Sequence, residues 1–201
     1  MKAALVLILL LFSAYATSEE SNVFTNPTAG FSVTKPVGWH YVSAEQNLNN
    51  LKATQLDDKE FQAAMVKYAT TPMVAMTKYE EPYADVNPSF KVNIKQLEQF
   101  KGKDPKDIIG FILPHFQKLF KDFKLVQPPI DVPVSGISSA YARINYTMEV
   151  PGIGALPITS ELWIVPRGDY FFLVGAGSRQ DEKTGSRKEI DSIIKTIVIT
   201  K

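Results

Sequence analysis

The feature that most constrains the fold is a strand pattern at residues 140–150, where apolar and polar side chains alternate. One face would carry Ala140, Ala142, Ile144, Tyr146, Met148 and Val150, and the other Tyr141, Arg143, Asn145, Thr147 and Glu149. A period of two is typical of a β-strand with one face on a core and the other toward solvent. The pattern therefore predicts an antiparallel sheet that is half covered at this strand.

Further segments also have strand character. Residues 158–165 and 170–176 are separated by Pro166-Arg167-Gly168-Asp169, which predicts a hairpin. The run Tyr170-Phe171-Phe172-Leu173-Val174 is apolar on both faces, so we expect it to be a central strand. Two more strands are expected earlier in the chain, at 74–79 and 90–97.

Two segments show the spacing of amphipathic helices. In 57–68, Asp57 can cap the N-terminus and Glu60 follows three residues on, ahead of an apolar stripe. Near the C-terminus a second helix is predicted by a stripe formed by Ile190, Ile193, Ile194 and Ile197.

A third helix is predicted over 104–123, where Asp104 is the expected N-cap and Pro105 takes the first helical position. Its apolar residues cover more than one face, so we expect a helix buried on two sides. A lid over an apolar pocket is the alternative. Pro114 inside the helix removes one backbone hydrogen bond and crowds the carbonyl of Gly110, which predicts a kink or a break.

The stretch GFSVTKPVGWHYV, residues 30–42, reads as a short strand, a Pro-Gly turn and a second extended run, which would form the first hairpin of a core. In the second run Trp39 and Tyr41 share one face and His40 takes the other. A Trp after such a turn is most often a large core anchor. We therefore expect a buried Trp39 and a surface His40, rather than a ligand-binding triplet.

The N-terminus has the features of a secretory signal peptide. Lys2 gives a short basic region, the apolar run that follows is shorter than the ~20 residues that span a bilayer, and Ala14-Tyr15-Ala16 supplies small residues for cleavage. We expect a signal peptide over 1–16, a disordered stretch over 17–21 and one domain over 22–201. An N-terminal anchor helix that stays uncut is the alternative.

The charge and the cysteine content of the chain limit which cellular compartment and which classes of partner can be expected. The chain has 22 Lys+Arg and 21 Asp+Glu, so loss of Lys2 with the signal peptide leaves 21 of each. Such a balance gives no overall field to attract nucleic acid or an anionic membrane. The chain has no cysteine, and an exported domain of this size can bury enough core without disulfides. We expect a bacterial periplasmic or secreted protein that does not bind nucleic acid.

The sequence contains no recognisable catalytic, metal or cofactor motif. His40 and His115 have no second His or Cys at ligand spacing. No Gly-x-Ser-x-Gly nucleophile motif is present. Gly152-Ile153-Gly154 joins two strands and has Pro157 where a dinucleotide fingerprint needs its third glycine. We therefore predict no catalytic residue, no metal and no bound cofactor.

Two apolar loops are candidate contacts for a partner protein. The loop 150–157 has no charged residue, although loop tips are normally polar. Ile153 and Leu156 therefore either fold back onto the domain or project as an apolar contact. Prolines stiffen both ends of the loop, so little entropy would be lost on binding. Tyr83 and Val86, in the 81–88 loop, form a weaker second patch.

Together these motifs resemble the PsbP-like superfamily, which includes DcrB-like periplasmic proteins. The resemblance rests on Gly30-Phe31, Val33, Pro36 and Gly38-Trp39. It also rests on the C-terminal order of a long strand, a hairpin with Tyr170-Phe171-Phe172-Leu173, a polar loop and the isoleucine-rich helix. The resemblance implies an α+β fold in which an antiparallel sheet is sandwiched between helices (α/β/α) in a single domain. It also implies a non-enzymatic accessory role, and no catalytic residue is carried over.

Three functions remain open from the sequence. The leading hypothesis is an exported binding protein that helps to assemble or maintain an envelope protein complex through unidentified envelope partners. The first alternative is a periplasmic carrier of an apolar small molecule, held in a pocket under the helix 104–123. The second alternative is an enzyme whose site the motifs do not reveal.

The signal peptide gives a direct prediction. N-terminal sequencing of the exported protein should begin at Thr17, because the small residues before it fit the cleavage site. Met1 at the N-terminus of the mature fraction would show that the segment is retained.

Overall fold

The computed structural model describes residues 21–53, 71–150 and 152–200. Its largest element is a seven-stranded antiparallel sheet with the strand order β3-β4-β5-β9-β8-β7-β6, and a three-stranded sheet has the order β1-β2-β10. The strands are β1 (Val23–Asn26), β2 (Phe31–Thr34), β3 (His40–Tyr41), β4 (Val74–Thr77), β5 (Ser89–Gln96), β6 (Lys121–Val134), β7 (Ile137–Val150), β8 (Gly154–Arg167), β9 (Tyr170–Arg179) and β10 (Val198–Ile199). The helices are α1 (Ala44–Ala53), α3 (Pro105–Leu119) and α4 (Arg187–Lys195), with a 3-10 turn η1 (Glu98–Phe100).

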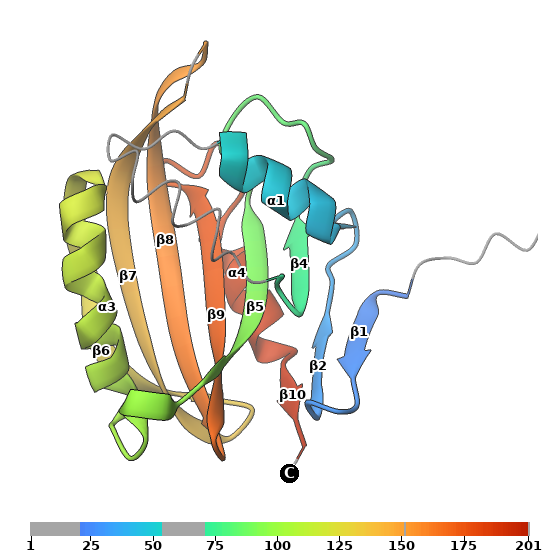
Figure 1. The fold of residues 1–201 in the computed structure, drawn as a ribbon. Coiled ribbons are helices and arrows are strands. Elements are labelled where there is room, and N and C mark those ends of the chain that lie inside the picture. Colours follow the sequence, from blue (N-terminus) through green and yellow to red (C-terminus); the bar gives the residue numbers. More distant parts are fainter. Residues whose placement is uncertain (1–20, 54–70, 151, 201) are drawn as a thin grey trace, which may run out of the picture.

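Helices lie on both faces of the large sheet. In Figure 1, α3 and α1 cross the near face and α4 lies on the far face. On the near face, Ile108 and Ile109 of α3 pack in a cluster with Ala140 of β7. On the far face, Ile190 and Ile193 of α4 pack in the main core. The predicted α+β fold, with an antiparallel sheet between helices, is confirmed.

Strand β9 lies in the middle of the large sheet, as its apolar sequence predicts. Phe172 and Val174 point into the core under α4. Phe171 and Leu173 point to the opposite face and join the cluster under α3. A strand buried on both faces must be apolar at nearly every position. β9 therefore belongs to both halves of the core.

Strand β7 confirms the alternation that its sequence predicts. Ala140, Ala142, Ile144 and Tyr146 are buried, whereas the residues between them are half exposed. The hairpin that joins β8 to β9 turns at Gly168-Asp169, where it was expected.

The prediction that residues 30–42 form a hairpin is wrong. β2 pairs with β1 and β10 in the small sheet, and β3 pairs with β4 in the large sheet. Because both edges of β2 are occupied, the chain must leave the small sheet after Thr34. It does so through a turn in which the Trp39 N–H donates to the Pro36 carbonyl at 3.1 Å. Gly38 supplies the positive φ of 78° that this turn needs.

The Trp-His-Tyr triplet behaves as predicted. Trp39 is 3% exposed and belongs to the main core. The His40 side chain is 43% exposed and lies 3.7 Å from a Glu80 carboxylate oxygen. The Lys35 ammonium donates to the Trp39 carbonyl at 2.7 Å and lies 5.2 Å from the centre of the Tyr41 ring. The triplet is therefore a core anchor with a surface histidine.

Helix α3 begins as predicted, since the Asp104 side chain accepts the Lys106 N–H at 2.8 Å. It differs from the prediction in three ways. It ends at Leu119 rather than near Phe123, because β6 begins at Lys121. It runs through Pro114 without a break, and since Gly110 and Pro114 are both exposed, water can reach the carbonyl that loses its bond. It is buried on one side and not on two, with Phe111 54% exposed.

Neither α1 nor β6 was predicted from the sequence pattern. α1 follows a reciprocal cap in which the Ser43 N–H donates to the Gln46 side chain and the Gln46 N–H donates to the Ser43 hydroxyl. β6 contains Pro128, Pro129 and Pro133, which fit a strand only at a sheet edge, where β6 lies. The helix predicted over 57–68 lies outside the described residues.

The burial of Trp39 predicts the cost of its removal. Trp39→Ala should lower the free energy of unfolding by ~3–5 kcal/mol, because truncation leaves a cavity in the main core. Urea unfolding measures the change. Val37→Ala is the matched control in the same turn, since Val37 is 91% exposed. A loss below ~1 kcal/mol for Trp39→Ala, typical of a surface position, would contradict the assignment of Trp39 as a core anchor.

Candidate functional site

The hairpin of β7 and β8 extends beyond the strands on either side of it. Pairing between β6 and β7 begins at Lys121 and Thr147, and pairing between β8 and β9 ends at Ile158 and Arg179. Among the described residues, 148–150 therefore pair only with 154–156, across the hairpin, and we call 148–150 and 152–156 the hairpin tip. Figure 1 shows it projecting at the top of the molecule.

The hairpin tip closes through a tight turn. The Ile153 N–H donates to the Val150 carbonyl at 3.0 Å. Gly152 and Gly154 have φ values of 76° and 100°, which other residues rarely adopt. Gly152 and Gly154 are thus needed for the backbone conformation of the turn. This agrees with the conclusion from the sequence that they do not belong to a dinucleotide-binding motif.

The predicted 150–157 loop is shorter than expected, because Gly154 and the residues after it are already part of β8. Leu156 lies opposite Met148 in the ladder and is 9% exposed. Ile153, at the turn, is 47% exposed. The two residues proposed together as a contact therefore differ, since one packs inward and the other faces solvent.

An apolar cluster fills the base of the hairpin tip, and we call it the hairpin cluster. Its buried members are Val86, Ile144, Tyr146, Leu156 and Ile158, and Leu113, Phe116, Phe120, Phe123, Met148 and Val150 pack against them. The Phe120 and Tyr146 rings stack with centres 4.0 Å apart. The structure therefore brings Val86 and Leu156, from the two predicted patches, into one cluster.

The 81–88 loop is fixed against the end of β9 and the segment that follows it. Arg179 donates to the Asp85 carboxylate at 2.5 Å, and the Thr184 hydroxyl donates to the Val86 carbonyl at 2.6 Å. Tyr83 is half buried and stacks on Tyr79, with ring centres 4.5 Å apart. Of the four predicted contact residues, Ile153 is thus the one with a largely free side chain.

A buried carboxylate, which the sequence analysis did not single out, joins α4 to the large sheet. The Glu161 side chain is 1% exposed, and Arg187 donates to its two oxygens at 3.0 and 3.1 Å. The Tyr141 hydroxyl also donates to this carboxylate. Burial, followed by the hydrogen bond to Glu161, raises the pKa of Tyr141. The available signal was a single acidic residue in the apolar strand segment 158–165.

This cluster is suited to holding structure rather than to proton transfer. Both oxygens of Glu161 already accept charge-assisted or hydroxyl hydrogen bonds. The bond to Glu161 also raises the pKa of Arg187, which stays charged. Neither group is left free to act as a base or as an acid toward a substrate.

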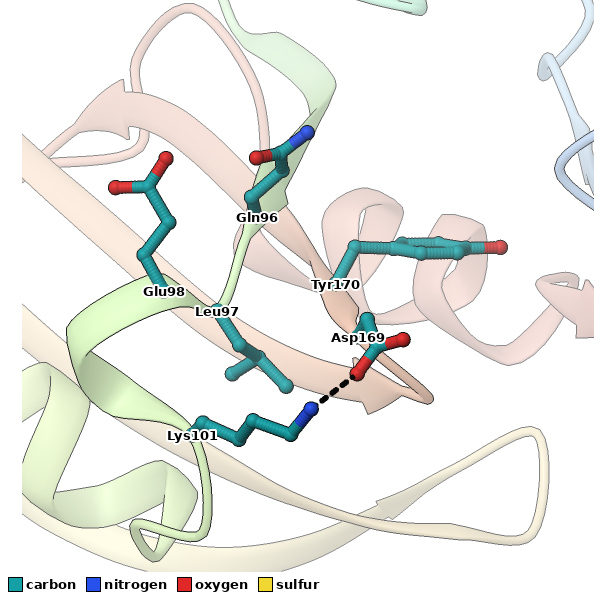
Figure 2. A pocket seen from close by; sticks show the side chains of 6 residues that line it. All are labelled: Gln96, Leu97, Glu98, Lys101, Asp169 and Tyr170. Atoms are coloured by element: carbon teal, nitrogen blue, oxygen red, sulfur yellow. Dashed lines mark hydrogen bonds and ion pairs between the residues drawn. The ribbon is translucent and has the colours of Figure 1, made fainter.

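The opposite end of the sheet has a shallow depression of about 390 Å³. Figure 2 shows its lining residues, Gln96, Leu97, Glu98, Lys101, Asp169 and Tyr170. Lys101 and Asp169 pair at 2.9 Å, but their side chains are 75% and 86% exposed. Water therefore screens this pair, and the depression does not enclose a ligand.

Across 21–53, 71–150 and 152–200, no three His, Cys, Asp or Glu side chains lie close enough to hold a metal ion. Over the same ranges, no helix has the length and apolar character to cross a membrane.

Comparison with known proteins identifies the fold. No protein-family model matches the chain, and no curated protein does so either. Among solved structures, cyanobacterial PsbP (CyanoP) from Synechocystis sp. PCC 6803 is similar with a TM-score of 0.52 and 10% identity, over 94% of this chain and 99% of that one. LpqN, involved in cell envelope biogenesis of Mycobacterium tuberculosis, is similar with a TM-score of 0.51 and 12% identity, over 85% of this chain and 83% of that one. The expected likeness to PsbP-like proteins is confirmed at the level of the fold.

The half-buried phenol of Tyr141 predicts a loss of stability at alkaline pH. Its pKa is raised above the ordinary value of 10.0, so the folded protein keeps this proton at a pH where the unfolded chain has lost it. The contribution of Tyr141 to stability is therefore complete below about pH 10 and is lost as the pH rises further. The free energy of unfolding, measured in urea across this range, should fall less steeply in Tyr141→Phe, which cannot ionise. An unchanged slope would mean that the phenol titrates alike in both states.

Proposed function

We propose that the protein is an exported, non-enzymatic accessory protein that binds a partner through the hairpin tip and helps to assemble or maintain an envelope protein complex. The observation that carries this proposal is Ile153, an exposed apolar side chain at the end of a tight, glycine-shaped turn. A scattered surface isoleucine needs no explanation. An isoleucine held at the outermost point of a projecting hairpin is placed to reach a pocket on another protein.

The hairpin cluster supports this role because it orders the tip before binding. Met148, Val150 and Leu156 pack against buried residues of the sheet, so the tip is held by side chains as well as by its own ladder. An isolated two-stranded hairpin is marginally stable in water. A tip that is already ordered loses little conformational entropy on binding, which favours affinity.

The absence of an enzymatic role is part of the proposal. The buried carboxylate of Glu161 is fully bonded within the protein. The depression shown in Figure 2 is open and lined by a solvated ion pair. The carrier function gains no support, because Ile108 and Ile109 of α3 are 1% and 0% exposed and pack directly against the sheet.

The exported location rests on the signal-like sequence of residues 1–16. LpqN, which shares the fold, is described as involved in cell envelope biogenesis. We carry a related role over to this protein as part of the proposal, since fold alone does not determine function.

The test is Ile153→Asp in the full chain, expressed in cells and crosslinked before affinity purification. We expect the partner to be lost from the crosslinked material, because a charge at the contact must be desolvated on binding. The free energy of unfolding should change by no more than ~0.5 kcal/mol, as at other exposed positions.

Two variants serve as controls. Ile94→Asp places the same charge on an isoleucine of β5 that is 41% exposed, and should keep the partner. Leu156→Asp should destabilise the domain, because Leu156 is buried in the hairpin cluster. If Ile153→Asp folds and still captures the same partner as the unsubstituted protein, the contact does not lie at the hairpin tip.

A further inference from the structure

The far face of β6, β7 and β8, on which α4 lies, carries a group of polar side chains beside the helix. Residues directly opposite each other in a ladder point to the same face. Arg143 lies opposite Glu161 of β8 and opposite Gln127 of β6, and Asn145 lies opposite Lys124. Lys124, Arg143 and Asn145 are therefore neighbours on the face that holds the buried Glu161. We call these three residues the donor row.

The donor row has hydrogen-bond donors but no acceptors for them in the described part of the chain. Neither Arg143 nor Lys124 has a hydrogen-bonded or ionic partner among these residues, although guanidinium and ammonium groups carry five and three N–H bonds. The Asn145 side-chain oxygen accepts the Thr159 hydroxyl at 2.9 Å, which leaves its NH₂ group for another partner. Lys124 is exposed, and Arg143 and Asn145 are half buried.

Three acidic groups on or near this face, Glu161, Glu149 and Asp191, are already in use. Glu161 is bonded by Arg187 and Tyr141, although it stands opposite Arg143 in the ladder. Glu149, further along β7, pairs with Lys121 at 2.8 Å. Asp191 of α4 lies 3.9 Å from Arg187. Lys124 and Arg143 therefore leave an excess of positive charge on this face, although the chain as a whole is close to neutral.

We propose that the donor row binds an acidic segment of a partner protein, with Arg143 holding a carboxylate and Lys124 and the Asn145 amide completing the contact. A guanidinium matches the planar geometry of a carboxylate and can hold it through two parallel hydrogen bonds. Because Arg143 is half buried, its bond to the ligand is less screened than one at a fully exposed lysine.

This surface is distinct from the contact proposed at Ile153. The donor row lies on the α4 side of the sheet, whereas Tyr146 and the hairpin cluster lie on the α3 side, since neighbouring residues of β7 point to opposite faces. The inference shares with the proposed function only the premise that the protein binds other proteins. It can fail while the contact at Ile153 holds, and the reverse is also true.

The experiment measures fluorescence anisotropy of a labelled peptide of alternating Glu and Ser, titrated with the full-length protein purified after export. We expect binding that weakens with added salt, and no binding of the same peptide with Gln in place of Glu. Arg143→Gln should weaken binding by about tenfold or more, because it removes a charge-assisted bidentate contact. Arg143→Lys should keep part of the affinity, since lysine has the same charge but cannot form the two parallel hydrogen bonds of a guanidinium.

The controls separate a local contact from general charge. Lys103→Gln removes one positive charge from an exposed position in the turn before α3 and should bind the peptide as the unsubstituted protein does. Ile153→Asp should also bind it normally. Thermal melting verifies that each variant is folded.

Three results would overturn the inference. One is the absence of binding to the acidic peptide at low salt. Another is equal affinity in Arg143→Gln and Lys103→Gln, which would leave only a diffuse charge effect. The third is complete displacement of the peptide by inorganic phosphate at equal concentration, which would make the donor row a site for small oxyanions and not for a protein segment.

Discussion

The burial of both faces of β9 in the middle of the large sheet is the constraint on which the rest of the structure depends. Phe172 and Val174 fill the core under α4, and Phe171 and Leu173 fill the cluster under α3. Removal of this apolar area from water supplies the main favourable free energy of folding, roughly 25 cal/mol per Å². The centre of the sheet is covered on both sides. Its partly exposed side chains therefore lie mainly on β6, on β7 and at the hairpin tip.

The two proposed contacts follow from this arrangement. The pairing of β6 with β7 and of β9 with β8 stops before the ends of β7 and β8, so their shared hairpin extends beyond the flanking strands and is stabilised by the hairpin cluster instead. On the opposite side of the sheet, Arg187 of α4 donates hydrogen bonds to both carboxylate oxygens of Glu161. Arg143, which faces the same carboxylate in the ladder, is left with donors to offer. The core thus accounts for one apolar and one basic surface on neighbouring parts of the protein.

The sequence predicted what depends on local pattern. The alternation in β7, the two-faced β9, the N-cap at Asp104 and the buried Trp39 all follow from side-chain periodicity or turn chemistry, and each is confirmed. Pairing between distant strands was not predictable in this way. β2 reads as half of a local hairpin but pairs with β10, the last strand of the chain. β6 was not predicted, because its prolines are unfavourable in strands except at an edge.

The candidate site was predictable in part for the same reason. An uncharged loop between two strands marked Ile153 and Leu156, but the sequence could not tell which of them packs inward, since that depends on Val86 and on the end of α3. The donor row could not be found from spacing along the chain, because Lys124 and Arg143 become neighbours only through the register of β6 against β7. Glu161 stands out in the sequence as a single acidic residue in an apolar strand. Its partner Arg187 could not be identified from the sequence, because it lies beyond the next strand.

The central claim is that the hairpin tip is ordered before any partner binds. Hydrogen exchange of backbone amides in the purified, unliganded protein tests this most directly. The account predicts slow exchange throughout β9 and clear protection of the paired amides in 148–150 and 154–156, because the hairpin cluster anchors these residues to the folded core. Exchange of the paired amides of 148–150 and 154–156 at the rate of an unfolded chain, with β9 still protected, would contradict the claim.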